Sequence, residues 1–174
     1  VEQVSIDEVI DSNKIYNIIL SNLDVFKNYT LKTGDTYGHE LFLNFTNNKK
    51  LNFPMNKHIE MFILKNQKDI NKVIKYIIFR YKFHLAGSKK INFGYPPYLL
   101  IEPVSTCNLR CPFCFQTDKS FTKKPFMGVI DFEFFKNIVD QADEMGTGAV
   151  TIASRGEPTM HKKYAQMLEY LNKK

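Results

Sequence analysis

The sequence predicts an α/β fold in the second half of the chain, and three observations support this. Residues 98–104 (Tyr-Leu-Leu-Ile-Glu-Pro-Val) and 148–153 have the composition of short buried strands. Between them, apolar residues recur at helical spacing after Asp131, a good N-cap, and Gly146 follows as a stop. A second helix is predicted over 163–171. The order strand, helix, strand, helix predicts a right-handed parallel βαβ unit, in which ligands lie at the carboxyl ends of the strands.

The first half of the chain, residues 1–95, is predicted to be an α+β region. Residues 6–23 have mixed helical periodicity, and residues 69–84 carry apolar side chains at spacings of three and four, which is typical of an amphipathic helix. Residues 40–46 (Glu-Leu-Phe-Leu-Asn-Phe-Thr) have strand-like composition. We find no catalytic constellation in this region.

Composition and charge exclude several classes of protein. With 174 residues, 44% of them hydrophobic, the chain can bury a core and is not disordered. A Gly- and Pro-containing segment near residues 92–98 divides it into regions 1–95 and 96–174. The net charge of +6 is diffuse, so no nucleic-acid partner is expected. Without a targeting signal or an apolar run long enough to span a membrane, we expect a cytoplasmic protein.

The three cysteines of the chain are the main chemical signal. Cys107, Cys111 and Cys114 lie within eight residues, and an odd number argues against a disulfide framework. A shared metal or cluster is the natural interpretation. An iron–sulfur cubane held by three cysteines leaves one iron open to another ligand, whereas structural zinc needs a fourth ligand, for which His161 is the candidate. Unligated buried thiols are a further alternative.

Two motifs carry a resemblance to a known family. The segment 107–114 (Cys-Asn-Leu-Arg-Cys-Pro-Phe-Cys), placed after a strand, resembles the cluster motif of radical S-adenosylmethionine (radical SAM) enzymes. The segment 154–158 (Ser-Arg-Gly-Glu-Pro), after the second strand, is similar to the GGEP motif of that family, with Arg155 replacing the first glycine. Residues 127–135 are similar to the entry of the first helix in the SPASM-type subgroup. The resemblance covers residues 96–174.

The resemblance implies the first two βα units of a partial (βα)6 barrel and an oxidoreductase-type chemistry. The ligands of a 4Fe-4S cluster would be Cys107, Cys111 and Cys114. The residues that would bind S-adenosylmethionine are Phe113, Ser154, Gly156, Glu157 and Pro158. The cluster would cleave S-adenosylmethionine reductively to a 5′-deoxyadenosyl radical, which abstracts hydrogen from an unidentified substrate.

Structural interpretations compete with these assignments. Glu157 can cap the turn that follows it, and Phe113 and Phe115 can be core aromatics. Arg155 can contact an anionic substrate or be solvated, and we expect it to be solvated. His161 is expected to be a surface residue near a helix start rather than a ligand.

The implied partners are a small-molecule or peptide substrate and an electron donor such as flavodoxin or ferredoxin. From Cys107 to the end of the chain there is room for only two strands of the barrel. We therefore predict that the chain is an incomplete part of the enzyme and does not cleave S-adenosylmethionine alone. The alternative function is a non-catalytic binding module stabilised by zinc or by an iron–sulfur cluster.

Overall fold

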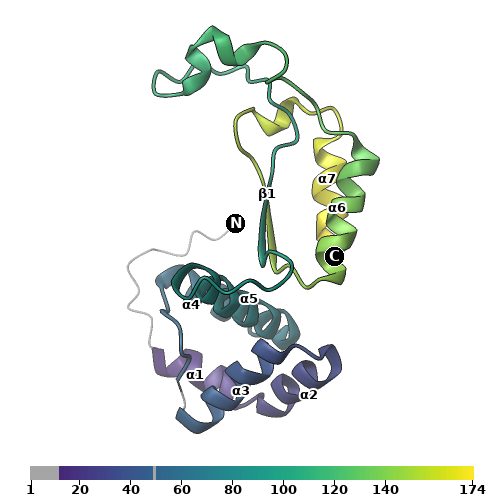
Figure 1. Ribbon diagram of the computed structural model, residues 1–174. Helices are drawn as coiled ribbons and strands as arrows, with labels where there is room; N and C mark the ends of the chain where they lie inside the picture. Colours follow the sequence, from purple (N-terminus) through teal and green to yellow (C-terminus); the bar gives the residue numbers. More distant parts are fainter. Residues whose placement is uncertain (1–11, 49) are drawn as a thin grey trace. The chain divides into compact units, whose positions relative to one another are not determined.

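The computed structural model describes residues 12–48 and 50–174, and the chain divides into two compact units, residues 1–91 and 92–174. In its described part the first unit is helical, and the second contains a small sheet with helices (Figure 1). None of the described helices combines the length and the apolar character that a membrane span requires.

Five helices make up the described part of the first unit. They are α1 (Ser12–Leu20), α2 (Leu23–Thr33), α3 (Thr36–Asn48), α4 (Lys57–Lys65) and α5 (Ile70–Ser88). The predicted helix over 69–84 is confirmed by α5, whose N-cap Asp69 accepts a hydrogen bond from Lys72 N at 3.1 Å. Its apolar stripe is buried because α2, α3 and α5 pack against one another. The start of the predicted helical stretch 6–23 lies outside the described residues.

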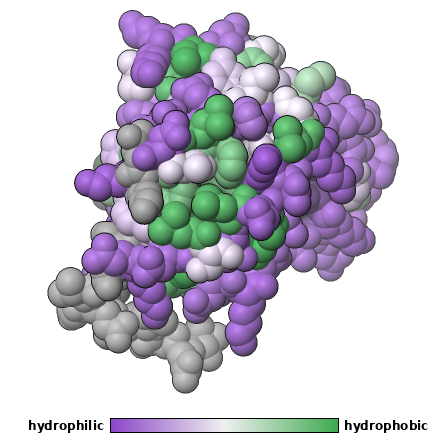
Figure 2. Space-filling view, turned by 90° about the horizontal axis from the view of Figure 1, so that it is seen from below, coloured by the Kyte–Doolittle hydropathy of each residue, from purple (hydrophilic) through white to green (hydrophobic). Residues whose placement is uncertain are grey.

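The predicted strand over residues 40–46 is wrong, because this segment lies within α3. A strand would bury alternate residues, whereas the structure buries Leu41, Phe42 and Phe45 and leaves Leu43 exposed. Spacings of one, three and four place the buried residues on a single helical face. The described part of the first unit is therefore all-helical and not the α+β region that its composition suggested. Figure 2 shows a face of the molecule on which apolar patches alternate with hydrophilic side chains.

The second unit contains the predicted βαβ arrangement. Its elements are β1 (Tyr98–Ile101), η1 (Phe115–Thr117), η2 (Lys119–Thr122), α6 (Phe132–Glu144), β2 (Ala149–Ile152), η3 (Pro158–Met160) and α7 (Tyr164–Asn172). The two strands pair in parallel, with Tyr98 opposite Ala149 and Ile101 opposite Ile152. Asp131 caps α6 as expected by accepting hydrogen bonds from two backbone amides of the first turn. The α/β class is thus confirmed for this unit.

Helices α6 and α7 lie on one face of the two-stranded sheet (Figure 1). The core between them and the sheet is built on four buried residues: Ile101, Phe135, Val139 and Met167. Leu99 packs against this core, whereas Leu100, its neighbour in the strand, is 57% exposed. Because strand side chains alternate between faces, one face of the sheet is covered and the other is open within this unit.

Candidate functional site

The cysteines lie on a loop whose two ends are joined. After β1 the chain forms an antiparallel bridge between Val104 and Val129, and Ser105 N donates a hydrogen bond to Gly128 O at 2.9 Å. Residues 105–128 therefore form a single loop that begins after the carboxyl end of β1 and whose two ends are hydrogen-bonded to each other. It carries η1 and η2 in its outer part (Figure 1). Such a loop holds functional groups at the edge of the sheet without belonging to the core.

The three cysteines of this loop are half-buried and free of disulfides. Cys107 Sγ accepts a hydrogen bond from Leu109 N at 3.4 Å, and Cys114 N donates to Cys111 O at 3.0 Å. Among the described residues, no three His, Cys, Asp or Glu side chains lie close enough together to hold a metal ion. The loop thus carries three soft sulfur donors that are partly accessible to solvent. In this structure they do not form a group that could hold a metal ion.

The aromatic residues of the loop are not core residues. Phe113 is 91% exposed, so its interpretation as a core aromatic is wrong. Phe115 is also exposed, and its ring packs edge to face against Phe121 at a centroid distance of 5.7 Å. Phe121 in turn contacts Phe126 at 5.7 Å. This small aromatic cluster stabilises the outer part of the loop and leaves Phe113 free to contact a ligand.

The second motif meets the cysteine loop through the backbone at Gly156. A Cβ atom at this position would lie 1.8 Å from Val104 O and 2.8 Å from Thr106 O, so only glycine allows the two backbones to come this close. Next to it, Glu157 N donates a hydrogen bond to Thr106 O at 2.9 Å. The parallel pairing of β1 and β2 brings the two loops to the same edge of the sheet.

Glu157 takes the structural role that its position also suggested, as the cap of η3. Its Oε1 accepts hydrogen bonds from Thr159 Oγ1 at 2.7 Å and Thr159 N at 3.1 Å, and these bonds lower the pKa of the Glu157 carboxyl. Pro158 begins η3, where its missing N–H is not needed. Ser154 has a φ of 150°, a conformation that strains a residue with a side chain.

Arg155 is exposed to solvent, as expected, and its guanidinium also forms a two-pronged ion pair with Glu102. Its Nε donates to Glu102 Oε2 at 2.8 Å and its Nη2 to Glu102 Oε1 at 2.7 Å. The Arg155 guanidinium, against the opposing effect of partial burial, lowers the pKa of Glu102 to about 2. Glu102 was not identified from the sequence, although a carboxylate directly after a buried strand is a signal that it needs a partner.

His161 is buried rather than on the surface as expected. Its Nδ1 accepts a hydrogen bond from Lys163 N at 3.1 Å, so Nε2 carries the proton and donates to Ile130 O at 3.0 Å. Because both ring nitrogens are used, His161 does not serve as a fourth metal ligand in this arrangement. It ties the start of α7 to the segment that precedes α6.

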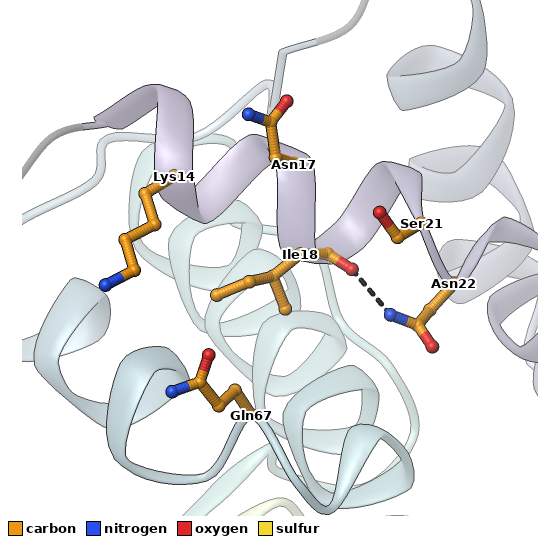
Figure 3. A pocket seen from close by; sticks show the side chains of 6 residues that line it. All are labelled: Lys14, Asn17, Ile18, Ser21, Asn22 and Gln67. Atoms are coloured by element: carbon orange, nitrogen blue, oxygen red, sulfur yellow. Dashed lines mark hydrogen bonds between the residues drawn. The ribbon is translucent and has the colours of Figure 1, made fainter.

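A groove of about 520 Å³ lies in the helical unit, apart from the two motifs (Figure 3). Its lining comprises Lys14, Asn17, Ile18, Ser21, Asn22 and Gln67. Asn22 Nδ2 is already used in a hydrogen bond to Ile18 O at 2.8 Å. The groove is polar and offers Lys14 as its one titratable side chain, so it contains no group of residues for catalysis.

Comparison with known proteins agrees with the site in the second unit. Residues 101–174 match the Radical SAM superfamily. Over 78 residues the chain is 31% identical to the "Tungsten-containing aldehyde ferredoxin oxidoreductase cofactor-modifying protein" of Pyrococcus furiosus. This similarity covers 44% of the chain and 21% of the relative, so the chain spans about a fifth of that protein's length. No solved structure matches the chain significantly.

The family match contains both the cysteine loop and the 154–158 loop. It therefore supports the radical SAM resemblance at the level of the superfamily. The SPASM subgroup, the complete barrel and the division into functional regions remain predictions.

Proposed function

We propose that residues 96–174 are the N-terminal part of a radical SAM barrel, and that residues 1–95 form a separate region of the same enzyme. One observation carries this proposal: the two loops that bear the motifs meet at the carboxyl ends of adjacent parallel strands. The contact is specific, because Gly156 leaves no space between its own backbone and the carbonyls of Val104 and Thr106.

The donor set of the cysteine loop fits an iron–sulfur cluster. Cys107, Cys111 and Cys114 are free, half-exposed thiols, and sulfur is the ligand that such clusters use. Three thiolates would ligate three of the four irons of a 4Fe-4S cluster and leave one iron open to a second cofactor. All three lie on the segment 107–114, so a single loop would supply every protein ligand of the cluster.

The second loop supplies the proposed S-adenosylmethionine site. Ser154 and Gly156 offer backbone groups, Pro158 shapes the following turn, and the Glu157 carboxylate stays ionised at neutral pH to face an ammonium group. Phe113, exposed on the cysteine loop, is available to pack against the adenine. When bound, the cluster supplies the electron that cleaves S-adenosylmethionine to a 5′-deoxyadenosyl radical for hydrogen abstraction.

The wider assignments belong to the same proposal. A small-molecule substrate is favoured over a peptide, because the name of the relative describes the modification of a cofactor. The reduction requires an electron donor such as flavodoxin or ferredoxin, in the cytoplasm.

Anaerobic reconstitution with iron and sulfide tests this function. We expect a brown protein with a reducible cluster, and iron and sulfide in the proportions of one 4Fe-4S cluster per chain. Cys111→Ala should lose the cluster, whereas Thr122→Ala, an exposed position of the same loop, should keep it. A colourless protein with stoichiometric zinc would contradict the proposal.

The alternative binding module predicts a different result for the same variant. If the metal serves stability alone, Cys111→Ala should unfold residues 92–174, and the reconstituted protein should not bind S-adenosylmethionine. Hydrogen exchange of the second unit and equilibrium dialysis with labelled S-adenosylmethionine distinguish the two functions.

A further inference from the structure

The carboxylate of Glu102 is the point at which three segments of the second unit are tied together. Oε1 accepts from Ser105 Oγ and from Arg155 Nη2, both at 2.7 Å, and Oε2 accepts from Arg155 Nε at 2.8 Å and Arg155 N at 3.1 Å. Ser105 Oγ in turn accepts from Gly128 N at 3.3 Å. Glu102 therefore links the end of β1 to both ends of the cysteine loop and to the loop after β2.

Gln116 adds a second link between the same two loops. Its Nε2 donates to Ser105 O and to Arg155 O, both at 2.8 Å. Arg155 is thus held by its side chain, its amide and its carbonyl. The Arg155 side chain is 40% exposed and the Glu102 side chain 19%, and the bidentate guanidinium fork makes this pair stronger than an ordinary surface ion pair.

The strained residue of the second motif lies directly beside this anchor. Ser154 keeps its φ of 150° although it carries a side chain, and such conformations persist only where neighbouring contacts hold them. Arg155, the next residue, supplies those contacts through Glu102. The side chain that replaces the first glycine of the motif is therefore one of the groups that hold the loop, beside Gln116 and the Glu157 amide.

We propose that Glu102 and Arg155 are a positioning pair, which fixes the backbone of residues 154–157 against the cysteine loop and so presents a preformed surface to S-adenosylmethionine. The inference rests on the proposed function for its ligand, but the fixing of the loop is a property of the chain itself. A preorganised loop binds its ligand more tightly because less freedom is lost on binding.

The experiment compares Glu102→Gln, Arg155→Met and the double variant. Asp140→Asn is the matched control, since Asp140 also pairs with a cation, Lys174 Nζ at 2.7 Å, but lies on α6 away from both loops. Hydrogen exchange is measured first, without cofactors, at the amides of Arg155 and Glu157. We expect these amides to exchange roughly tenfold faster in both single variants than in the unaltered chain. In the control variant the exchange rate should not change.

The affinity for S-adenosylmethionine is measured next, on the reconstituted full chain. Each single variant should bind about tenfold more weakly, and the double variant should be no worse than the weaker single, because the two residues act as a unit. Arg155→Lys, which keeps the charge but not the fork, should fall between the unaltered chain and Arg155→Met. It also provides a folded variant if removal of Glu102 prevents folding.

The outcomes separate the two proposals. Unchanged exchange at Arg155 and Glu157, or faster exchange with unchanged affinity, would overturn the positioning pair. An unaltered chain that assembles no cluster and binds no S-adenosylmethionine contradicts the proposed function, and the exchange comparison then still decides whether Glu102 and Arg155 hold the loop.

Discussion

The two units of the chain are stabilised in different ways. The helical unit buries large side chains completely, such as Phe26, Phe45 and Ile77. Tyr81 donates to Glu40 Oε1 at 2.6 Å, and burial together with this bond raises the pKa of Tyr81 to about 12. This unit depends on side-chain packing.

The stability of the βα unit depends more on contacts between its loops. Its core is small, one face of its sheet is open, and its two motif loops are joined by the Glu102–Arg155 pair and by the close approach at Gly156. The candidate functional residues thus lie in the unit with the smaller core, where loops can stay accessible to ligands. Four substitutions test this difference between the two units.

The largest effect is expected from Phe135→Ala in the βα unit. Phe135 is fully buried in the small core, and its truncation should cost about 3–5 kcal/mol. Residues 92–174 should lose their protection against hydrogen exchange while α5 keeps its own. Phe45→Ala, at a fully buried position of the helical unit, is the comparison, and it should leave that unit folded. Equal loss of protection in both units would contradict the contrast.

Gly156→Ala comes next, because a Cβ atom there collides with backbone. The two loops must separate, at a cost of about 3 kcal/mol or less, and exchange at the Glu157 amide should rise sharply. Gly87→Ala in α5 is the control. Apart from its chain neighbours and the backbone of its own helix, no atom lies within 4 Å of a Cβ at Gly87, so this variant should gain roughly 0.5–1 kcal/mol in stability.

Glu102→Gln should remove a pH-dependent part of the stability of the βα unit. The folded pKa of Glu102 is about 2, below its ordinary value of 4.5, so its contribution is complete above pH 4.5 and is lost as the pH falls toward 2. At neutral pH we expect a loss of about 2 kcal/mol, reduced for partial exposure. Hydrogen exchange between pH 2 and 5 measures it, and a variant with the pH slope of the unaltered chain would refute the assignment.

The smallest effect is expected for Asp35→Asn in the helical unit. Asp35 Oδ2 pairs with Lys82 Nζ at 2.6 Å, and Oδ1 accepts from Gly38 N at 3.0 Å in the first turn of α3. Asparagine keeps the cap and removes the charge, and Asp35 makes a single bond to Lys82 rather than the bidentate pair of Glu102, so about 1 kcal/mol should be lost. Denaturation followed by circular dichroism measures this change, and a loss larger than that of Glu102→Gln would reverse the comparison.

Local sequence patterns were sufficient to predict the βα unit and to identify its candidate functional residues. Buried-strand composition, helical spacing and the Asp131 cap are local signals, and the three cysteines lie within eight residues of one another, so no long-range information was needed to recognise them. The strand predicted over 40–46 failed, because a short apolar run does not distinguish a strand from a helix until its neighbours choose which face is buried.

How the cysteine loop and the loop 154–158 are joined can be seen only in the tertiary structure. Arg155 and Glu102 are 53 residues apart in sequence, and His161 reaches Ile130 across 31 residues, so neither partner could be assigned from local patterns. A polar side chain next to a buried strand must find a partner, but the chain's path determines which one. The position of the three cysteines on one loop after a strand was therefore predictable, whereas the polar network that joins this loop to residues 154–157 was not.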